Sequence, residues 1–160
     1  MKDIPIGRVA AGQEHSIFLN AKGDSVYACG HGNYGQLGIP KEELEFKKDG
    51  QVSDKQAVRF CRFPRRVAFP KTDRLDKIGR FVDIFCGDNH TCVITTAGKI
   101  YSFGYGEYGQ CGNDPRVYTT DISRARLNDD WLKDCDLCVY QGSGGSQHTL
   151  IVASRHKKTV

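Results

Sequence analysis

One pattern of glycine, histidine and aromatic residues occurs twice in this chain, at an offset of 75 residues that falls to 74 after a shorter turn in the second copy. Each copy reads G-x-x-H-[ST], then G-x-[IV]-Y or a close variant, then G-x-G-x-Y-G-Q-[LC]-G. The copies cover residues 12–38 and 87–112, and a shorter third copy covers 145–154. Self-similarity at a fixed period is typical of solenoids, propellers and arrays, whose units bury their apolar faces only against one another. Two units and a fraction are too few to close a ring, so we expect part of a larger propeller or an open array.

The segments between the glycines indicate β-hairpins. Residues 15–20 and 90–95 carry apolar side chains at both odd and even positions, which is typical of strands that are covered on both faces. Gly23 and Gly98 follow, where a tight turn needs glycine. Residues 25–30 and 99–104 are again rich in aromatic and β-branched side chains. We therefore predict an all-β fold of adjacent four-stranded antiparallel blades, with a short helical turn near residues 128–133 as the one exception.

The glycine-rich segments match the dinucleotide-binding pattern G-x-G-x-x-G. A dinucleotide site requires the third glycine to open a helix whose N-terminus holds the pyrophosphate. Glycine and proline follow in both copies, at Gly38, Pro40, Gly112 and Pro115, and they disfavour that helix. We therefore interpret this loop as structural.

The seven cysteines do not form a disulfide pattern. Their number is odd, and several stand where the other copy has an apolar residue: Cys29, Cys86, Cys92 and Cys111. We expect these to be small buried hydrophobic residues in a reducing compartment. Cys135 and Cys138 have the spacing of half a zinc site or of a redox pair, but a lone C-x-x-C is a weak signal, and we predict no metal and no cofactor.

Composition excludes few functions. The net charge of +4 hints at acidic partners. No apolar run approaches the length of a membrane helix, and the first residues lack the apolar stretch of a signal peptide. We expect a soluble intracellular protein with no membrane partner and no small-molecule substrate.

The repeated motifs resemble those of the regulator of chromosome condensation family. The resemblance spans residues 8–38, 81–112 and 139–154, and the last copy with its short basic tail is most similar to the C-terminal part of the family's founding member. Members of this family fold as seven-bladed β-propellers, so the resemblance implies a partial propeller of about two and a half blades. On that basis the chain divides into the end of a preceding repeat (1–23), a repeat with a charged insert at 39–80 (24–97), a second repeat (98–155) and a basic tail (156–160).

The resemblance also implies a function. The founding member is the exchange factor for the small GTPase Ran and acts on nucleosomes, so the implied location is the nucleus. Exchange needs no covalent catalysis, because the factor binds the nucleotide-free GTPase more tightly than the loaded form. The alternative is a cytoplasmic, non-enzymatic scaffold of the kind found in ubiquitin ligases and vesicle-traffic factors.

Three histidines are candidate GTPase contacts on this resemblance. His15 and His148 match motif histidines of late blades that lie near Ran in the family, and His90 occupies the same position with less support. A structural role is the alternative, because a histidine between glycine and a hydroxyl residue is well suited to binding neighbouring loop backbone. The tyrosines and phenylalanine of the motifs are expected in the blade core: Tyr27, Tyr34, Tyr101, Tyr108 and Phe103.

The segment between the first two copies is rich in basic residues. We expect residues 44–55 to form an exposed loop of low order, because the segment alternates charge and has no apolar period. Within the rest of the segment, Arg62, Arg65 and Arg66 are the candidate contacts to nucleosomal DNA or to an acidic protein surface. A solvated surface segment is the alternative.

Overall fold

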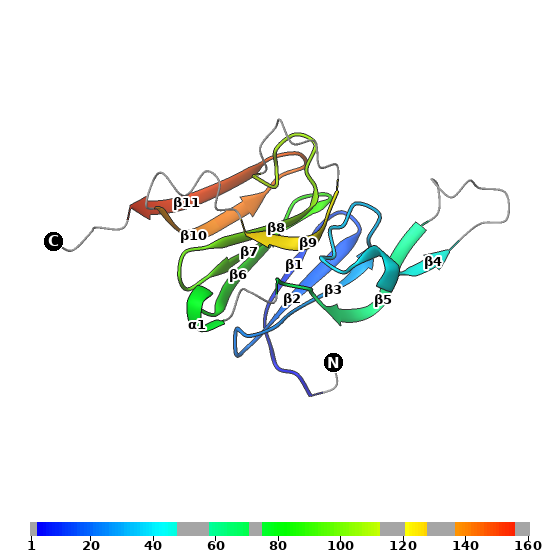
Figure 1. The fold of residues 1–160 in the computed structure, drawn as a ribbon, viewed down its shortest axis with the longest axis horizontal. Coiled ribbons are helices and arrows are strands. Elements are labelled where there is room, and N and C mark those ends of the chain that lie inside the picture. The colour runs from blue at the N-terminus through cyan, green and yellow to red at the C-terminus, as the bar shows by residue number, and fades with distance from the viewer. Residues whose placement is uncertain (1–2, 48–57, 71–74, 113–120, 128–136, 156–160) are drawn as a thin grey trace.

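The chain forms three antiparallel β-sheets that lie side by side (Figure 1). The computed structural model describes residues 3–47, 58–70, 75–112, 121–127 and 137–155. Within these residues the only helices are a four-residue α1 (Leu75–Ile78) and a single 3-10 turn (Lys41–Glu43). The predicted all-β class is confirmed. The helical turn expected near residues 128–133 lies outside the described residues.

The first sheet has five strands in the order β1-β2-β3-β5-β4. Their bounds are β1 (Ile6–Ala11), β2 (His15–Asn20), β3 (Val26–His31), β4 (Glu45–Lys47) and β5 (Val58–Arg66). The prediction of an exposed loop at 44–55 is wrong at its start. Leu44 is buried, and β4 pairs with β5. In this pairing Phe46 lies opposite Arg59, whose guanidinium lies 5.5 Å from the Phe46 ring centre. Residues 48–57 lie outside the described residues.

The second sheet has four strands and the third has two described strands. The second consists of β6 (Phe81–Cys86), β7 (His90–Thr95), β8 (Ile100–Tyr105) and β9 (Asp121–Leu127), and the third of β10 (Leu137–Gly144) and β11 (Thr149–Arg155). His15 pairs with Gly30 across the first hairpin, and His90 pairs with Gly104 across the second. The two sequence copies therefore have the same register, and the fifth strand of the first sheet is its main departure from the expected four.

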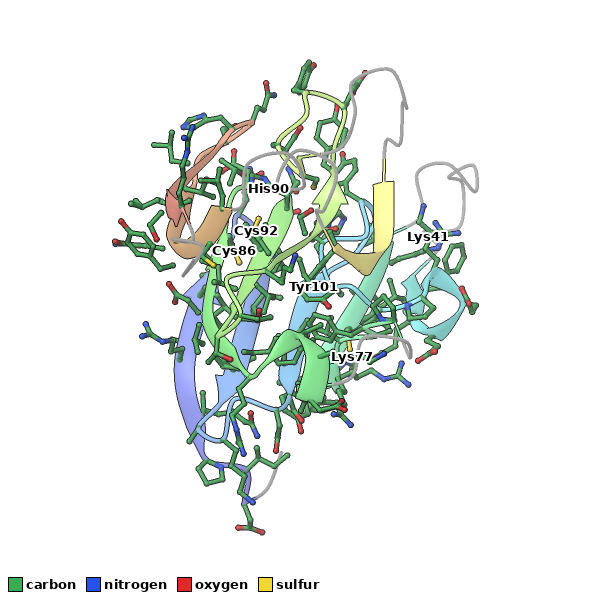
Figure 2. The ribbon with its side chains drawn as sticks, turned by 60° about the vertical axis from the view of Figure 1, so that its left-hand side comes forward. Lys41, Lys77, Cys86, His90, Cys92 and Tyr101 are labelled. Atoms are coloured by element: carbon green, nitrogen blue, oxygen red, sulfur yellow. The ribbon has the colours of Figure 1, made fainter. Side chains whose placement is uncertain are left out.

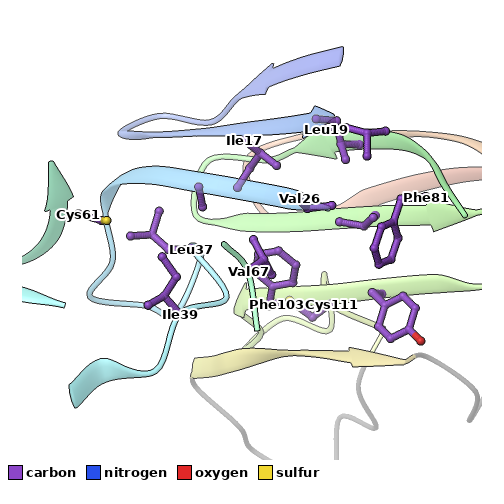
Figure 3. Packing of buried hydrophobic residues seen from close by; sticks show 14 of the residues in the cluster. Ile17, Leu19, Val26, Leu37, Ile39, Cys61, Val67, Phe81, Phe103 and Cys111 are labelled. Atoms are coloured by element: carbon purple, nitrogen blue, oxygen red, sulfur yellow. The ribbon is translucent and has the colours of Figure 1, made fainter. Parts of the chain in front are cut away.

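The larger hydrophobic core lies between the first two sheets (Figure 3). Ile17, Val26 and Leu37 of the first unit are fully buried, as is Phe103 of the second. Phe103 and Val67 close over Gly38, where an added Cβ would lie 2.9 Å from the Phe103 ring and 2.7 Å from Val67. Burial of this kind supplies most of the stability of stacked units.

A smaller core joins the second and third sheets. It consists of the buried residues Phe85, Cys92, Ile94, Ile100 and Val139. Each sheet thus depends on its neighbour for burial, as the repeat predicted. No helix in the described part of the chain is long and apolar enough to cross a lipid bilayer.

Candidate functional site

The G-x-x-H loops lie where one sheet meets the next. In each loop the glycine N–H donates a hydrogen bond to the carbonyl of the histidine three residues later, at 2.9 Å for Gly12 and 3.0 Å for Gly87. An added Cβ on Gly12 would lie 2.1 Å from the His15 ring and 2.6 Å from the Gly87 carbonyl oxygen. Only glycine therefore allows the loop to close over its own histidine while the next loop approaches.

The motif histidines join neighbouring sheets. His15 Nε2 lies 2.9 Å from Thr91 Oγ1, and His90 Nε2 lies 2.8 Å from Thr149 Oγ1. Thr91 and Thr149 are the hydroxyl residues of the G-x-x-H-[ST] motif in the following unit. Figure 2 shows His90 beside Cys86 and Cys92 on the second sheet. The structure supports the structural alternative for these two histidines, although the partner is a side chain of the next unit and not loop backbone.

The hydroxyl hydrogens define the direction of these bonds. Thr91 Oγ1 donates its hydrogen to the Gln36 carbonyl at 2.8 Å, and Thr149 Oγ1 donates to the Gln110 carbonyl at 2.7 Å. A hydroxyl has one hydrogen, so each histidine must donate from Nε2–H. Nδ1 then carries a lone pair and has no hydrogen-bond partner in either ring.

Burial keeps both rings neutral. It lowers the pKa of His15 from 6.5 to about 4, with smaller contributions from His90 and His31. Burial also lowers the pKa of His90 to about 4, against the opposing effect of Asp88. A proton on Nδ1 would place an unpaired N–H in the interior, which is unfavourable.

His148 differs from its two counterparts. It is exposed, whereas His15 and His90 are 3% and 0% exposed. The described residues contain no fourth unit that could place a hydroxyl against it. Of the three candidate GTPase contacts, only His148 has the exposed position that the prediction required.

The glycine-rich loops form turns and not helices. Residues 32–40 and 106–112 contain no helix, in agreement with the interpretation that this G-x-G-x-x-G pattern is structural. A buried glutamine holds each loop, because Gln36 Oε1 accepts the Tyr34 N–H at 3.0 Å and Gln110 Oε1 accepts the Tyr108 N–H at 2.9 Å.

The expected core position of the loop tyrosines is wrong. Tyr34 is 42% exposed and Tyr108 is 61% exposed, because the turns direct both side chains away from the sheets. Tyr101 and Phe103 are fully buried as predicted, and Tyr27 is half-buried.

The structure does not bring Arg62, Arg65 and Arg66 to one point. All three lie exposed on β5. Arg62 and Arg65 contact Glu45 and the Glu43 carbonyl on one side, whereas Arg66 donates to the Asp24 carbonyl at 3.4 Å in the β2–β3 turn. The three arginines therefore form two separate basic positions along one strand.

The described cysteines are all free thiols. Of the four cysteines expected to be buried, Cys92 and Cys111 are buried but Cys29 and Cys86 are only half-buried; Cys61 is also buried, and Cys138 is half-buried. Burial raises the pKa of Cys86 and of Cys111 to about 12. Cys135 lies outside the described residues, and the described residues include no group of three or more potential metal ligands.

Comparison with known proteins identifies the repeat. Two models of the Regulator of chromosome condensation (RCC1) repeat match the chain, one over residues 24–94 and the other over 8–36 and 81–110. The chain belongs to the RCC1 repeat family. Its sheets are therefore blades of an RCC1-type propeller, and the recognised repeat begins between β2 and β3 and ends within β7.

Relatives in the RCC1 family have different functions. The chain is 32% identical over 156 residues to the human Regulator of chromosome condensation, covering 97% of this chain and 34% of that protein. It is 33% identical over 150 residues to the human probable E3 ubiquitin-protein ligase HERC3, covering 94% of this chain and 12% of that protein. The chain thus spans about a third or less of these relatives.

A solved structure has the same fold. Prp20p from Saccharomyces cerevisiae superposes with a TM-score of 0.78 at 22% identity, over 99% of this chain and 33% of Prp20p. That structure was described together with the binding of Prp20p to Gsp1p and histones. At this identity the likeness establishes the propeller fold.

Sequence reasoning did not identify the partners of the motif histidines. Thr91 and Thr149 belong to the motif, but nothing in one copy indicates that its hydroxyl binds the previous copy. The glutamines Gln36 and Gln110 were also missed, although both stand at the same motif position in the two copies.

Proposed function

We propose that this chain is part of a guanine nucleotide exchange factor for the small GTPase Ran that acts at chromatin in the nucleus. The observation that carries the proposal is the 32% identity to the human Regulator of chromosome condensation over nearly the whole chain. The fold shared with Prp20p, a protein described as binding Gsp1p and histones, supports it.

The geometry suits a protein-binding function. Two of the three motif histidines are engaged in bonds between blades, and their neutral rings hold the loops in place. An exchange factor accelerates nucleotide release by binding the nucleotide-free GTPase more tightly than the loaded form. Loops held on packed sheets lose little freedom on binding, which favours affinity for a partner protein.

His148 is the proposed GTPase contact among the three histidines. It follows a glycine-rich loop at the start of β11 and is exposed. His15 and His90 contribute indirectly, because their bonds to Thr91 and Thr149 fix the loops of consecutive blades.

The test uses the full-length protein that contains this segment. Replacing His148 with Ala should slow the release of labelled GDP from Ran and leave the melting temperature within a few degrees, because exposed residues contribute little to stability. Ser146→Ala, in the same exposed loop, serves as the matched control. An exchange rate that is unchanged in His148→Ala would overturn the assignment of this residue.

Contact with chromatin is the second part of the proposal. Arg62 and Arg65 at one position, and Arg66 at another, are the proposed contacts to DNA or to an acidic histone surface. Their exposure on one strand supports this role.

A non-enzymatic scaffold is the alternative function, and the 33% identity to the ubiquitin ligase HERC3 favours it. Such a scaffold would bind its partner in fixed proportion and would act in the cytoplasm or the nucleus. Full-length protein that leaves the rate of GDP release from Ran unchanged at saturating concentration would favour the scaffold over the exchange factor.

A further inference from the structure

Four aromatic rings form a continuous row at the ends of the third strands of the first two blades. The row runs His31, Tyr34, Tyr105, Tyr108, with ring centres 6.1, 5.4 and 6.0 Å apart and neighbouring rings meeting edge to face. We call these four residues the aromatic ladder. The middle contact, between Tyr34 and Tyr105, joins the first unit to the second.

Two rings of the ladder are exposed and held in place, and the other two are half-buried. Tyr34 and Tyr108 are 42% and 61% exposed. Their backbone N–H groups bind the buried side chains of Gln36 and Gln110, so the loops beneath the rings are held from inside the fold. Rings that are already ordered lose little entropy when a partner covers them.

Four described segments beside the ladder contain carboxylates and no basic side chain, and the backbone of Arg59 pairs with one of them while its guanidinium lies over Phe46. Residues 12–15, 31–36, 87–90 and 105–110 are all described, and they contain Glu14, Asp88 and Glu107 but no lysine or arginine. The whole chain has 23 basic and 19 acidic residues. A locally acidic end on a basic protein indicates a cationic partner.

Within the described residues, no lysine or arginine forms an ion pair with Glu14 or Glu107. Glu14 Oε2 lies 3.7 Å from His31 Nδ1, but that nitrogen lies 3.2 Å from the amide nitrogen of Gln36, which can only donate. In this arrangement Nδ1 of His31 accepts the hydrogen bond from the Gln36 amide. At the other end of the ladder, Glu107 accepts the hydroxyl hydrogen of Tyr105.

We propose that the aromatic ladder binds lysine or arginine side chains of an extended segment of a partner protein. Aromatic faces attract cations, and carboxylates at both ends of the row add Coulomb attraction. The same carboxylates repel phosphate, which disfavours a nucleic acid at this surface. This property does not depend on the partner being Ran, so it can hold or fail separately from the exchange activity.

The experiment is a titration of the full-length protein that contains this segment with an acetylated (Ala-Arg)3 amide peptide, followed by NMR of the tyrosine ring signals and by fluorescence anisotropy. The matched peptide has citrulline in place of arginine, which keeps the shape and removes the charge. We expect the arginine peptide to shift the Tyr34 and Tyr108 signals and the citrulline peptide to leave them unchanged. Each of Tyr34→Leu and Tyr108→Leu should weaken binding about 2- to 5-fold, the effect of one exposed cation–π contact.

Two controls distinguish binding at the ladder from nonspecific binding of the peptide. Phe63→Leu removes a 72% exposed ring on β5 that makes no ring contact with the ladder, and it should leave the affinity unchanged. Glu14→Gln combined with Glu107→Gln should weaken binding, whereas Glu45→Gln beside Arg62 should not. The charge variants retain all four rings, so they test the surface even where a tyrosine variant fails to fold.

Equal binding of the two peptides would overturn the proposal. So would tyrosine and glutamate variants that bind the arginine peptide as tightly as the unmodified chain. Tyrosine shifts with a single-stranded oligonucleotide but not with the arginine peptide would show that the surface recognises nucleic acid, and would equally refute it.

Discussion

His15 Nε2 donates to Thr91 Oγ1 across the boundary between the first two sheets, at a distance of 2.9 Å and a separation of 76 residues. His90 and Thr149 form the same bond at the next boundary. The G-x-x-H-[ST] motif thus connects neighbouring sheets on both sides: His15 and His90 bind the following sheet, and Thr91 and Thr149 bind the preceding one.

These bonds between sheets predict which histidines stabilise the fold. His15→Ala and His90→Ala should each lower the free energy of unfolding by about 1–3 kcal/mol, because each removes the hydrogen-bond donor of the buried Thr91 hydroxyl or the half-buried Thr149 hydroxyl. His148→Ala should change it by less than about 0.5 kcal/mol, because that ring is exposed. Urea unfolding followed by circular dichroism measures all three. Equal losses at His90 and His148 would contradict the stabilising role of these bonds.

The two buried histidines also predict a pH dependence. Their pKa is about 4 in the folded chain and 6.5 when unfolded, so between these values the unfolded state binds more protons. Stability should therefore fall as pH decreases from about 6.5 to about 4, by up to about 1.4 kcal/mol per pH unit for each histidine. Urea unfolding at pH 7, 6 and 5 tests this. The double variant His15→Gln, His90→Gln should show a flatter dependence over this range, and His148→Gln should not.

The cysteines should react in order of their burial. Cys92 and Cys111 are buried, and burial raises the pKa of both thiols, so alkylation at pH 8 should be slow. Cys138 is half-buried and should react earlier. Iodoacetamide labelling followed by peptide mass spectrometry measures the order. Labelling of Cys92 before Cys138 would mean that the boundary between the second and third sheets opens readily.

The arginines on β5 predict a salt effect on DNA binding. If they contact phosphates, Arg62→Ala and Arg65→Ala together should make the slope of log affinity against log salt shallower by about one for each residue. Arg66→Ala should act independently, since Arg66 lies at a separate position. Arg80→Ala, a basic residue outside β5, is the control. A slope that is unchanged in the triple variant would remove β5 from the DNA-binding surface.

The hairpins of each unit could be predicted because their determinants are local. Glycine turns at Gly23 and Gly98 and the apolar runs beside them fix the strands in both copies. β4 could not be predicted in this way. It has three residues, two of them charged, and its stability comes from pairing with β5 across the segment 48–57.

The site was predictable only in part, because each motif histidine and the threonine that it binds lie in different units. The repeat marks His15 and His90 as special but does not reveal whether they face solvent or the next sheet. Tyr34 and Tyr108 illustrate the same limit. Their loops lack the alternation of apolar and polar residues that distinguishes buried from exposed positions along a strand. Aromatic character alone therefore suggested a core position.

The recognised repeat at 24–94 begins between β2 and β3 and ends within β7, so one copy holds the second half of one blade and the first half of the next. Tandem duplication of such a segment would copy one half of each of two joints between blades: the hydroxyl of Thr91, which binds the previous blade, and the histidine His90, which binds the next. Every new blade would then be a chimera of two copies, already fitted to its neighbours on both sides. The segment that such a duplication would copy therefore does not coincide with one blade.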